Sequence, residues 1–88
     1  MLSLPTTLTQ DQATQCLEDL RQHMVEQDGS VVVCAAALSE FDSSALAVLL
    51  GVRRECERLG KGFAVQNMPK RLCNLATLYG IETLLPRP

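Results

Sequence analysis

The sequence contains little positive charge. Its 8 Lys and Arg residues are outnumbered by 10 Asp and Glu residues, and the formal net charge is −2. Proteins that bind nucleic acid usually gather Lys and Arg into a basic patch that neutralises phosphates, and this sequence has no such patch. We therefore expect no nucleic-acid partner.

Long hydrophobic runs are missing as well. The longest cover residues 31–38 and 45–52, whereas a helix that spans a bilayer needs about 20 apolar residues. Residues 1–5 carry no positive segment leading into an apolar stretch, so no secretory signal is predicted. The length of 88 residues suits one domain over residues 1–88, which we expect in the cytoplasm without direct insertion into a membrane.

Motifs for catalysis or metal binding are also absent. The glycines form no phosphate-binding loop, and a chain of this length leaves little room for an internal substrate cavity. The single histidine, His23, falls in the middle of a predicted helix. The cysteines form no CxxC pair and have apolar neighbours, so we expect reduced thiols in the core: Cys16, Cys34, Cys56 and Cys73.

These absences predict a protein that is not an enzyme and that needs no metal or cofactor. The alternative is a small enzyme or redox protein that uses His23 or a cysteine. That alternative requires a thiol whose pKa is lowered by its surroundings.

The rest of the sequence alternates between strand-like and helix-like patterns. Thr9 and Gln12 have the spacing of a capping box, and Gly29 predicts the end of the helix that follows. Residues 31–37 form a nearly continuous apolar run, typical of a strand buried on both faces. Such alternation with short loops predicts a parallel α/β sheet. The predicted strands are residues 2–8, 31–37 and 62–67, the helices 10–27, 44–59 and 69–79, and the candidate last strand 81–85.

The most informative feature is the polar cluster Asp42, Ser43 and Ser44, which stands between a buried strand and an apolar helix. A helix start presents unpaired backbone N–H groups and the positive end of the helix dipole, so it favours a phosphate on Ser43. The cluster could instead only cap the helix. The first half of this helix is apolar nearly all round, so it is either deeply buried or faces something outside the domain.

Residues 41–51, Phe-Asp-Ser-Ser-Ala-Leu-Ala-Val-Leu-Leu-Gly, resemble the central motif of STAS domains, a family named for sulfate transporters and anti-sigma-factor antagonists. Residues 58–62 and 75–81 are similar to the family as well, and the resemblance covers roughly residues 2–86. It implies an α/β fold with helices packed on a mixed, largely parallel β-sheet. It also implies that Ser43 occupies the Ser/Thr position of the family, which lies at the partner surface.

The end of the sequence is most similar to MlaB-type STAS proteins, small cytoplasmic subunits of the Mla phospholipid-transport ABC system. This resemblance implies a protein-interaction subunit that binds and supports an ATPase subunit similar to MlaF. It also implies a position at the cytoplasmic face of the inner membrane, reached through that partner. The expected partner-binding residues are Phe41, Asp42, Ser43, Ser44 and Leu46, flanked by Lys70 and Arg71.

The sequence departs from the family pattern in two places. Many STAS domains have a glycine where this chain has Ala45. They also usually open with a β-hairpin, whereas this chain has only the short segment at residues 2–8. We therefore expect a small sheet with a shortened first hairpin, whose uncovered edge could pair with another chain.

The alternative within the family is an anti-sigma-factor antagonist. In those proteins the serine that matches Ser43 is phosphorylated by the anti-sigma factor, a kinase, and this switches binding off. Apart from the start of the second helix, the sequence offers no phosphate cradle, so nucleotide binding is not part of the prediction.

Overall fold

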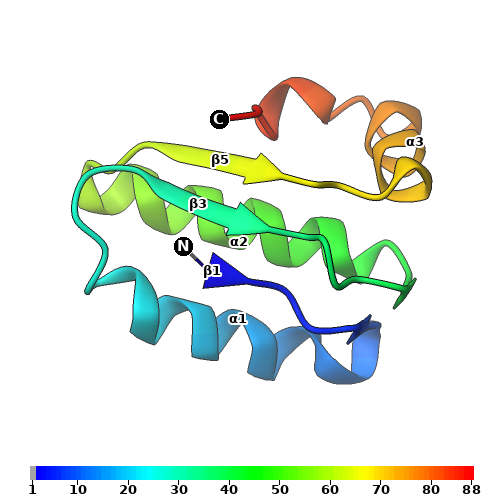
Figure 1. The fold of residues 1–88 in the computed structure, drawn as a ribbon, viewed down its shortest axis with the longest axis horizontal. Helices are drawn as coiled ribbons and strands as arrows, with labels where there is room; N and C mark the ends of the chain where they lie inside the picture. Colours follow the sequence, from blue (N-terminus) through cyan, green and yellow to red (C-terminus); the bar gives the residue numbers. More distant parts are fainter. Residues whose placement is uncertain (1) are drawn as a thin grey trace.

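The computed structural model describes residues 2–88, in which strands and helices alternate along the chain (Figure 1). This confirms the predicted α/β class. No helix within the described residues has the length and hydropathy of a membrane span. In chain order the elements are β1 (Leu2–Ser3), β2 (Thr7–Leu8), α1 (Gln10–Met24), β3 (Val31–Cys34), β4 (Glu40–Phe41), α2 (Ser44–Leu59), β5 (Phe63–Gln66), α3 (Lys70–Leu78) and the 3-10 helix η1 (Glu82–Leu84).

Three strands form one small sheet in the order β1-β3-β5, and all of them run parallel. Val33 of the central strand pairs with Leu2 on one side and with Val65 on the other. β2 and β4 form a separate parallel pair, in which Leu8 lies opposite Phe41. Since β2 leads into α1, β4 into α2 and β5 into α3, all three helices begin near the carboxyl end of the sheet, on the right in Figure 1.

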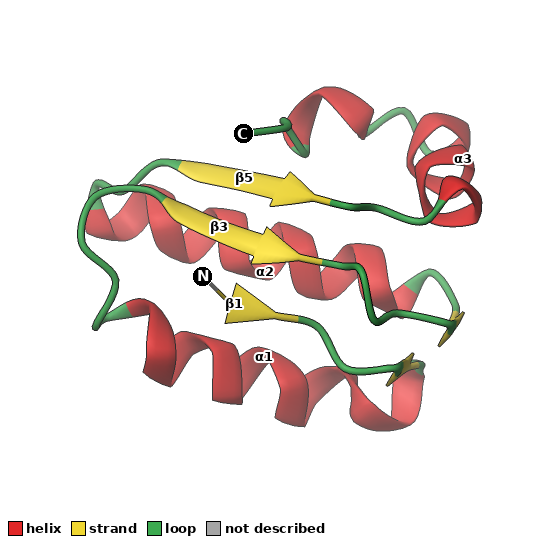
Figure 2. Cartoon of the chain, in the orientation of Figure 1, coloured by secondary structure: helices red, strands yellow, loops and turns green. Residues whose placement is uncertain are grey.

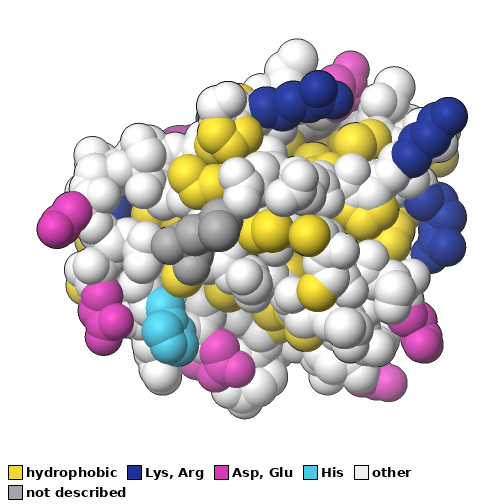
Figure 3. Space-filling view, in the orientation of Figure 1, with side chains coloured by type: hydrophobic (Ala, Val, Ile, Leu, Met, Phe, Trp, Pro, Cys, Tyr) yellow, Lys and Arg dark blue, Asp and Glu magenta, His cyan; other side chains and the backbone are white. Residues whose placement is uncertain are grey.

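Helices α1 and α2 cover one face of the sheet (Figure 2). Along β3, Val31 and Val33 face these helices and are fully buried, whereas Val32 and Cys34 remain partly exposed. Figure 3 shows hydrophobic atoms at the surface of the other face. The prediction of a strand buried on both faces is therefore wrong, because α3 lies beyond the end of β5 and not over the sheet. The strand also ends at Cys34, three residues earlier than predicted.

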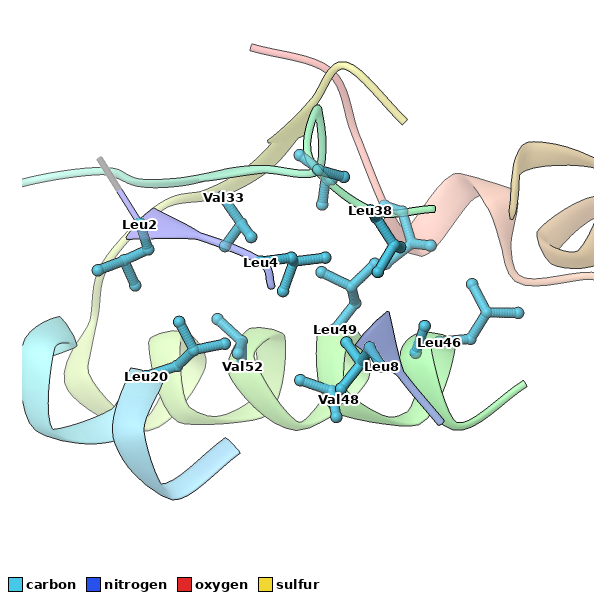
Figure 4. Close-up of a cluster of buried hydrophobic side chains, with 14 of the residues drawn as sticks. Leu2, Leu4, Leu8, Leu20, Val33, Leu38, Leu46, Val48, Leu49 and Val52 are labelled. Atoms are coloured by element: carbon cyan, nitrogen blue, oxygen red, sulfur yellow. The ribbon is translucent and has the colours of Figure 1, made fainter. Parts of the chain in front are cut away.

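Most of the hydrophobic core lies between the sheet and these two helices, and Leu72, Ala76 and Leu85 extend it to α3 and the C-terminal segment. In Figure 4, Leu4 and Val33 from the sheet side point toward Leu49 and Val52 of α2. The apolar first half of α2 belongs to this layer, since Val48 is only 2% exposed and Leu49 is fully buried. Of the two options that the sequence left open for this half of α2, burial in the core is the one observed.

The two ends of α1 are stabilised by different kinds of contact. At the start, the Thr9 N–H donates to Gln12 Oε1 over 2.9 Å, which confirms the predicted capping box. At the other end, the helix stops at Met24, before the predicted Gly29. Lys61 Nζ donates to the carbonyl oxygens of Met24 (2.8 Å) and Gln27, so a side chain distant in sequence satisfies these end carbonyls.

The C-terminal residues differ from the prediction of a last strand. Residues Glu82–Leu84 form the 3-10 helix η1. A single backbone bond, from the Val65 N–H to the Pro86 carbonyl (2.8 Å), joins the segment after η1 to the outer edge of β5. That segment therefore covers part of one sheet edge, while β1, at the other edge, has β3 as its only described strand neighbour.

Replacing Leu49 by Ala tests the single-layer core. Because Leu49 is fully buried, the cavity left by Leu49→Ala should lower the free energy of unfolding by about 3 kcal/mol, measured by urea denaturation. Leu78 is 76% exposed, so Leu78→Ala should change the same quantity by about 0.5 kcal/mol or less. Equal effects of the two substitutions would contradict this description of the core.

Candidate interaction site

Asp42 links the starts of two helices. It follows β4, and its Oδ1 accepts a hydrogen bond from the Ser44 N–H (2.8 Å) in the first turn of α2. Its Oδ2 accepts a weaker bond from the Gln10 N–H (3.4 Å) at the start of α1. The Ser44 N–H is the main cause that lowers the pKa of the Asp42 carboxyl, because hydrogen bonds to a carboxylate stabilise its charged form.

Ser43 is left free by this arrangement. Its side chain is exposed and makes no capping bond, and within residues 2–88 its hydroxyl has no hydrogen-bond partner. The capping function that the sequence assigned to either Asp42 or Ser43 therefore belongs to Asp42. The Ser43 hydroxyl is instead available to solvent, to a modifying enzyme or to a partner.

The backbone N–H groups around Ser43 are not unpaired, contrary to the expectation from sequence. The Ser44 N–H is bonded to the Asp42 side chain, the Ala45 N–H to the Asp42 carbonyl, and the Leu46 N–H to the Ser43 carbonyl. A phosphate on Ser43 would lie beside the Asp42 carboxylate and would find these donors already engaged. The helix dipole would therefore favour a phosphate on Ser43, but repulsion from the Asp42 carboxylate would oppose it.

Phe41 and Leu46 lie beneath the site. Their exposed fractions are 9% and 2%, so they support the helix start from the core and offer little surface to a partner. The Arg71 guanidinium, from the first turn of α3, lies over the Phe41 ring with Cζ 4.5 Å from the ring centroid. A contact of this kind is worth roughly 0.5–1 kcal/mol at an exposed position, and it ties α3 to β4.

The structure therefore divides the seven predicted site residues into two groups. Asp42, Ser43, Lys70 and Arg71 are exposed and Ser44 is half-buried, whereas Phe41 and Leu46 are buried. Lys and Arg side chains are visible at the right-hand edge of Figure 3, where α3 begins. The exposed surface near the carboxyl end of the sheet thus includes the Asp42 carboxylate, which caps α2, the free Ser43 hydroxyl and the cations of Lys70 and Arg71.

The cysteines are free, and within the described residues no three His, Cys, Asp or Glu side chains group together as a metal site would require. Burial raises the pKa of the Cys16 and Cys56 thiols. Cys34 differs from the expected core thiol: the Asn67 side-chain amide lies 3.5 Å from its Sγ and is the main cause that lowers its pKa. The His23 Nδ1 atom lies 2.8 Å from the Asp19 carbonyl oxygen on an exposed face of α1.

One feature that sequence reasoning missed is a surface cleft of about 510 Å³ between β5, α3 and the C-terminal residues. Val65, Met68, Ala76 and Leu85 provide apolar lining, and Arg87 lies at its border. The cleft combines a strand, a helix and a C-terminal segment, so no local motif in the sequence indicates it.

A comparison with known protein families gives a match. The profile of a family described as "Mlab, STAS domain" matches residues 1–86, which is nearly the whole chain. A search of curated proteins gave no match.

The capping function of Asp42 predicts a stability effect that depends on pH. Asp42→Ala should lower the unfolding temperature at neutral pH by a few degrees, measured by circular dichroism, because the Ser44 and Gln10 N–H groups lose their acceptor. Since the folded-state pKa of Asp42 is lowered, its contribution is present above its unfolded-state pKa. It is lost as the pH falls through its folded-state pKa, so the difference from the wild type should shrink in acid.

Ser43→Ala is the matched control for this prediction. The Ser43 hydroxyl makes no bond, so its removal should leave the unfolding temperature unchanged at every pH. A larger loss for Ser43→Ala than for Asp42→Ala would show that the capping functions are reversed.

Proposed function

The chain belongs to the STAS domain family, and from this premise we propose that it is a non-enzymatic subunit that binds the ATPase of an ABC transporter. Family membership supports a protein-interaction role in general. Within it, the resemblance of the C-terminal sequence to MlaB-type subunits favours an ATPase similar to MlaF, in a system that transports phospholipid. Binding to that ATPase would hold the chain at the cytoplasmic face of the inner membrane.

The observation that carries this proposal is the free Ser43 hydroxyl at the exposed start of α2. Asp42 holds the backbone at the start of α2 through the Ser44 N–H, so little backbone ordering at Ser43 is needed when a partner binds. Ser43 and the exposed Ala47 are small, which lets a partner backbone approach the helix closely. The core beneath, which includes Leu46, makes the surface rigid.

Support of the ATPase follows from mass action. A subunit that binds only the folded, assembled form of its partner stabilises that form by a free energy that grows with the logarithm of its concentration divided by the Kd. The chain needs no chemistry of its own for this role.

The first test is a binding titration of purified chain against the ATPase subunit of the phospholipid transporter. Ser43→Asp should weaken binding by about tenfold or more, because it places a charge in the interface beside the Asp42 carboxylate. Ser43→Thr keeps the hydroxyl and should bind like the wild type.

A matched control for added charge is Ser30→Asp. Ser30 is also exposed, but it precedes β3 and so lies at the amino end of the sheet, away from the proposed interface. It should leave the affinity unchanged. The proposal is refuted if Ser43→Asp binds the ATPase as tightly as the wild type does. It is also refuted if the wild-type chain does not bind the ATPase.

A second candidate, an anti-sigma-factor antagonist, is favoured by the same exposed hydroxyl, which a kinase can reach. Incubation with a kinase-type anti-sigma factor and ATP should then add one phosphate, located at Ser43 by mass spectrometry, and Ser43→Ala should remain unmodified. The added charge should release the partner, since the nearby Asp42 carboxylate repels it. Absence of the modification would leave the transporter subunit as the only family function proposed.

A further inference from the structure

Two strongly exposed large hydrophobic residues are adjacent at the end of α3. Within residues 2–88, the strongly exposed large hydrophobic side chains are Leu78 (76%), Val25 (66%) and Tyr79 (56%). Two of the three are adjacent at the end of α3, whereas Val25 follows α1 at the opposite end of the molecule (Figure 1). The exposed fraction of Tyr79 is notable because Phe41 is buried and Phe63 is half-buried. Tyr79 is thus the main aromatic side chain that the chain can offer to a partner.

Leu78 lies on the same side of α3 as Arg71. The helix buries Leu72 and Ala76 against the domain. Residues at intervals of three, four and seven share one side of a helix, and the exposed residues Arg71, Asn74 and Leu78 have this spacing. At 1.5 Å per residue, Leu78 lies about 10 Å along the helix from Arg71. The outer face of α3 therefore has a cationic end and an apolar end.

The cationic end of this face adjoins the proposed partner site. Arg71 lies over the Phe41 ring, and Phe41 directly precedes Asp42 and Ser43. A specific interface usually covers about 800 Å² on each protein, and the small side chains at the start of α2 supply only part of such an area. The residues that dominate binding energy in interfaces are most often Tyr, Trp and Arg. Arg71 lies on the outer face of α3, and the exposed Tyr79 directly follows the C-terminal end of that helix.

We propose that the outer face of α3, together with Tyr79 at its C-terminal end, is the second half of the partner interface, and that the partner covers both with an acidic surface around an apolar socket. The socket receives Leu78 and Tyr79, and carboxylates of the partner face Lys70 and Arg71. This inference rests on the proposed function, since the partner is the ATPase described above. It adds that the partner surface is acidic around an apolar socket, which the start of α2 alone does not indicate.

Charge complementarity supports an acidic partner. Helix α3 contains no acidic residue, and within the described residues neither Lys70 nor Arg71 forms an ion pair with this chain. Three other arginines are already paired within the chain, namely Arg21 with Glu18, Arg53 with Glu57 and Arg58 with Glu55. Among the described residues Arg54 and Arg87 also form no ion pair, but they lie outside α3. A second copy of this chain meeting the same face would bring four unpaired cations together, which disfavours self-association.

The test compares single substitutions in the same ATPase titration. Leu78→Ser and Tyr79→Ser should each weaken binding by about tenfold or more, because each removes an anchor from the socket. Val25→Ser is the matched control, since Val25 and Tyr79 are both exposed residues that cap the end of a helix. It should bind like the wild type, and circular dichroism should show the same fold for all variants.

Charge reversal tests the acidic character of the partner. Lys70→Glu should weaken binding at low salt, and the loss should shrink as salt screens the exposed charges. If Lys70→Glu binds the ATPase as tightly as the wild type or more tightly, the proposal of an acidic partner surface is refuted.

The remaining outcomes separate this inference from the proposed function. If Ser43→Asp weakens binding while both Leu78→Ser and Tyr79→Ser bind like the wild type, only the second half of the interface is refuted. If the wild-type chain does not bind the ATPase, the proposed function fails and this inference fails with it. A dimer seen by analytical ultracentrifugation and lost in Tyr79→Ser, with ATPase binding intact, would assign the face to a second copy and overturn the proposal.

Discussion

The structure depends on a single apolar layer, in which α1 and α2 pack against one face of a three-stranded parallel sheet. A domain of this size buries a modest share of its surface, so nearly all of its hydrophobic stabilisation has to come from that layer. The first half of α2 is consequently buried, and Val32 and Cys34 on the other face of the sheet stay partly exposed.

The candidate site lies at the edge of this apolar layer, at the start of α2. Leu46 and Phe41 turn inward, so the outward positions at the start of α2 are polar or small. One carboxylate, that of Asp42, then accepts bonds from the starts of both α1 and α2. Helices α1 and α2 are thereby joined at the position where the partner surface is proposed, and these bonds restrain the backbone there. The cation–π contact of Arg71 extends this restraint to α3.

Features that depend on local sequence could be predicted, and those that depend on distant residues could not. The capping box of Thr9 and Gln12 and the end of α2 at Gly60 are encoded within a few residues, and both are observed. The end of α1 was misplaced because it depends on Lys61, which lies far along the chain. Whether the second face of β3 is buried depends on where α3 packs, and the hydrophobic periodicity of the sequence does not indicate that position. The capping residue could not be chosen because Ser43 adopts helical φ and ψ angles of −62° and −15° and leaves the task to Asp42.

The contact of Lys61 with the end of α1 has a consequence for the order of folding. Its ammonium group bonds carbonyl oxygens 37 and 34 residues earlier in the chain. Contacts of such sequence separation require a long loop to close before they form. The first turn of α1 has a local capping box from Thr9 and Gln12, whereas the end of the helix gains the bonds from Lys61 only when the segment after α2 has docked. During folding, α1 should therefore become ordered from its beginning toward its end, and its last amide groups should gain protection from hydrogen exchange together with β5.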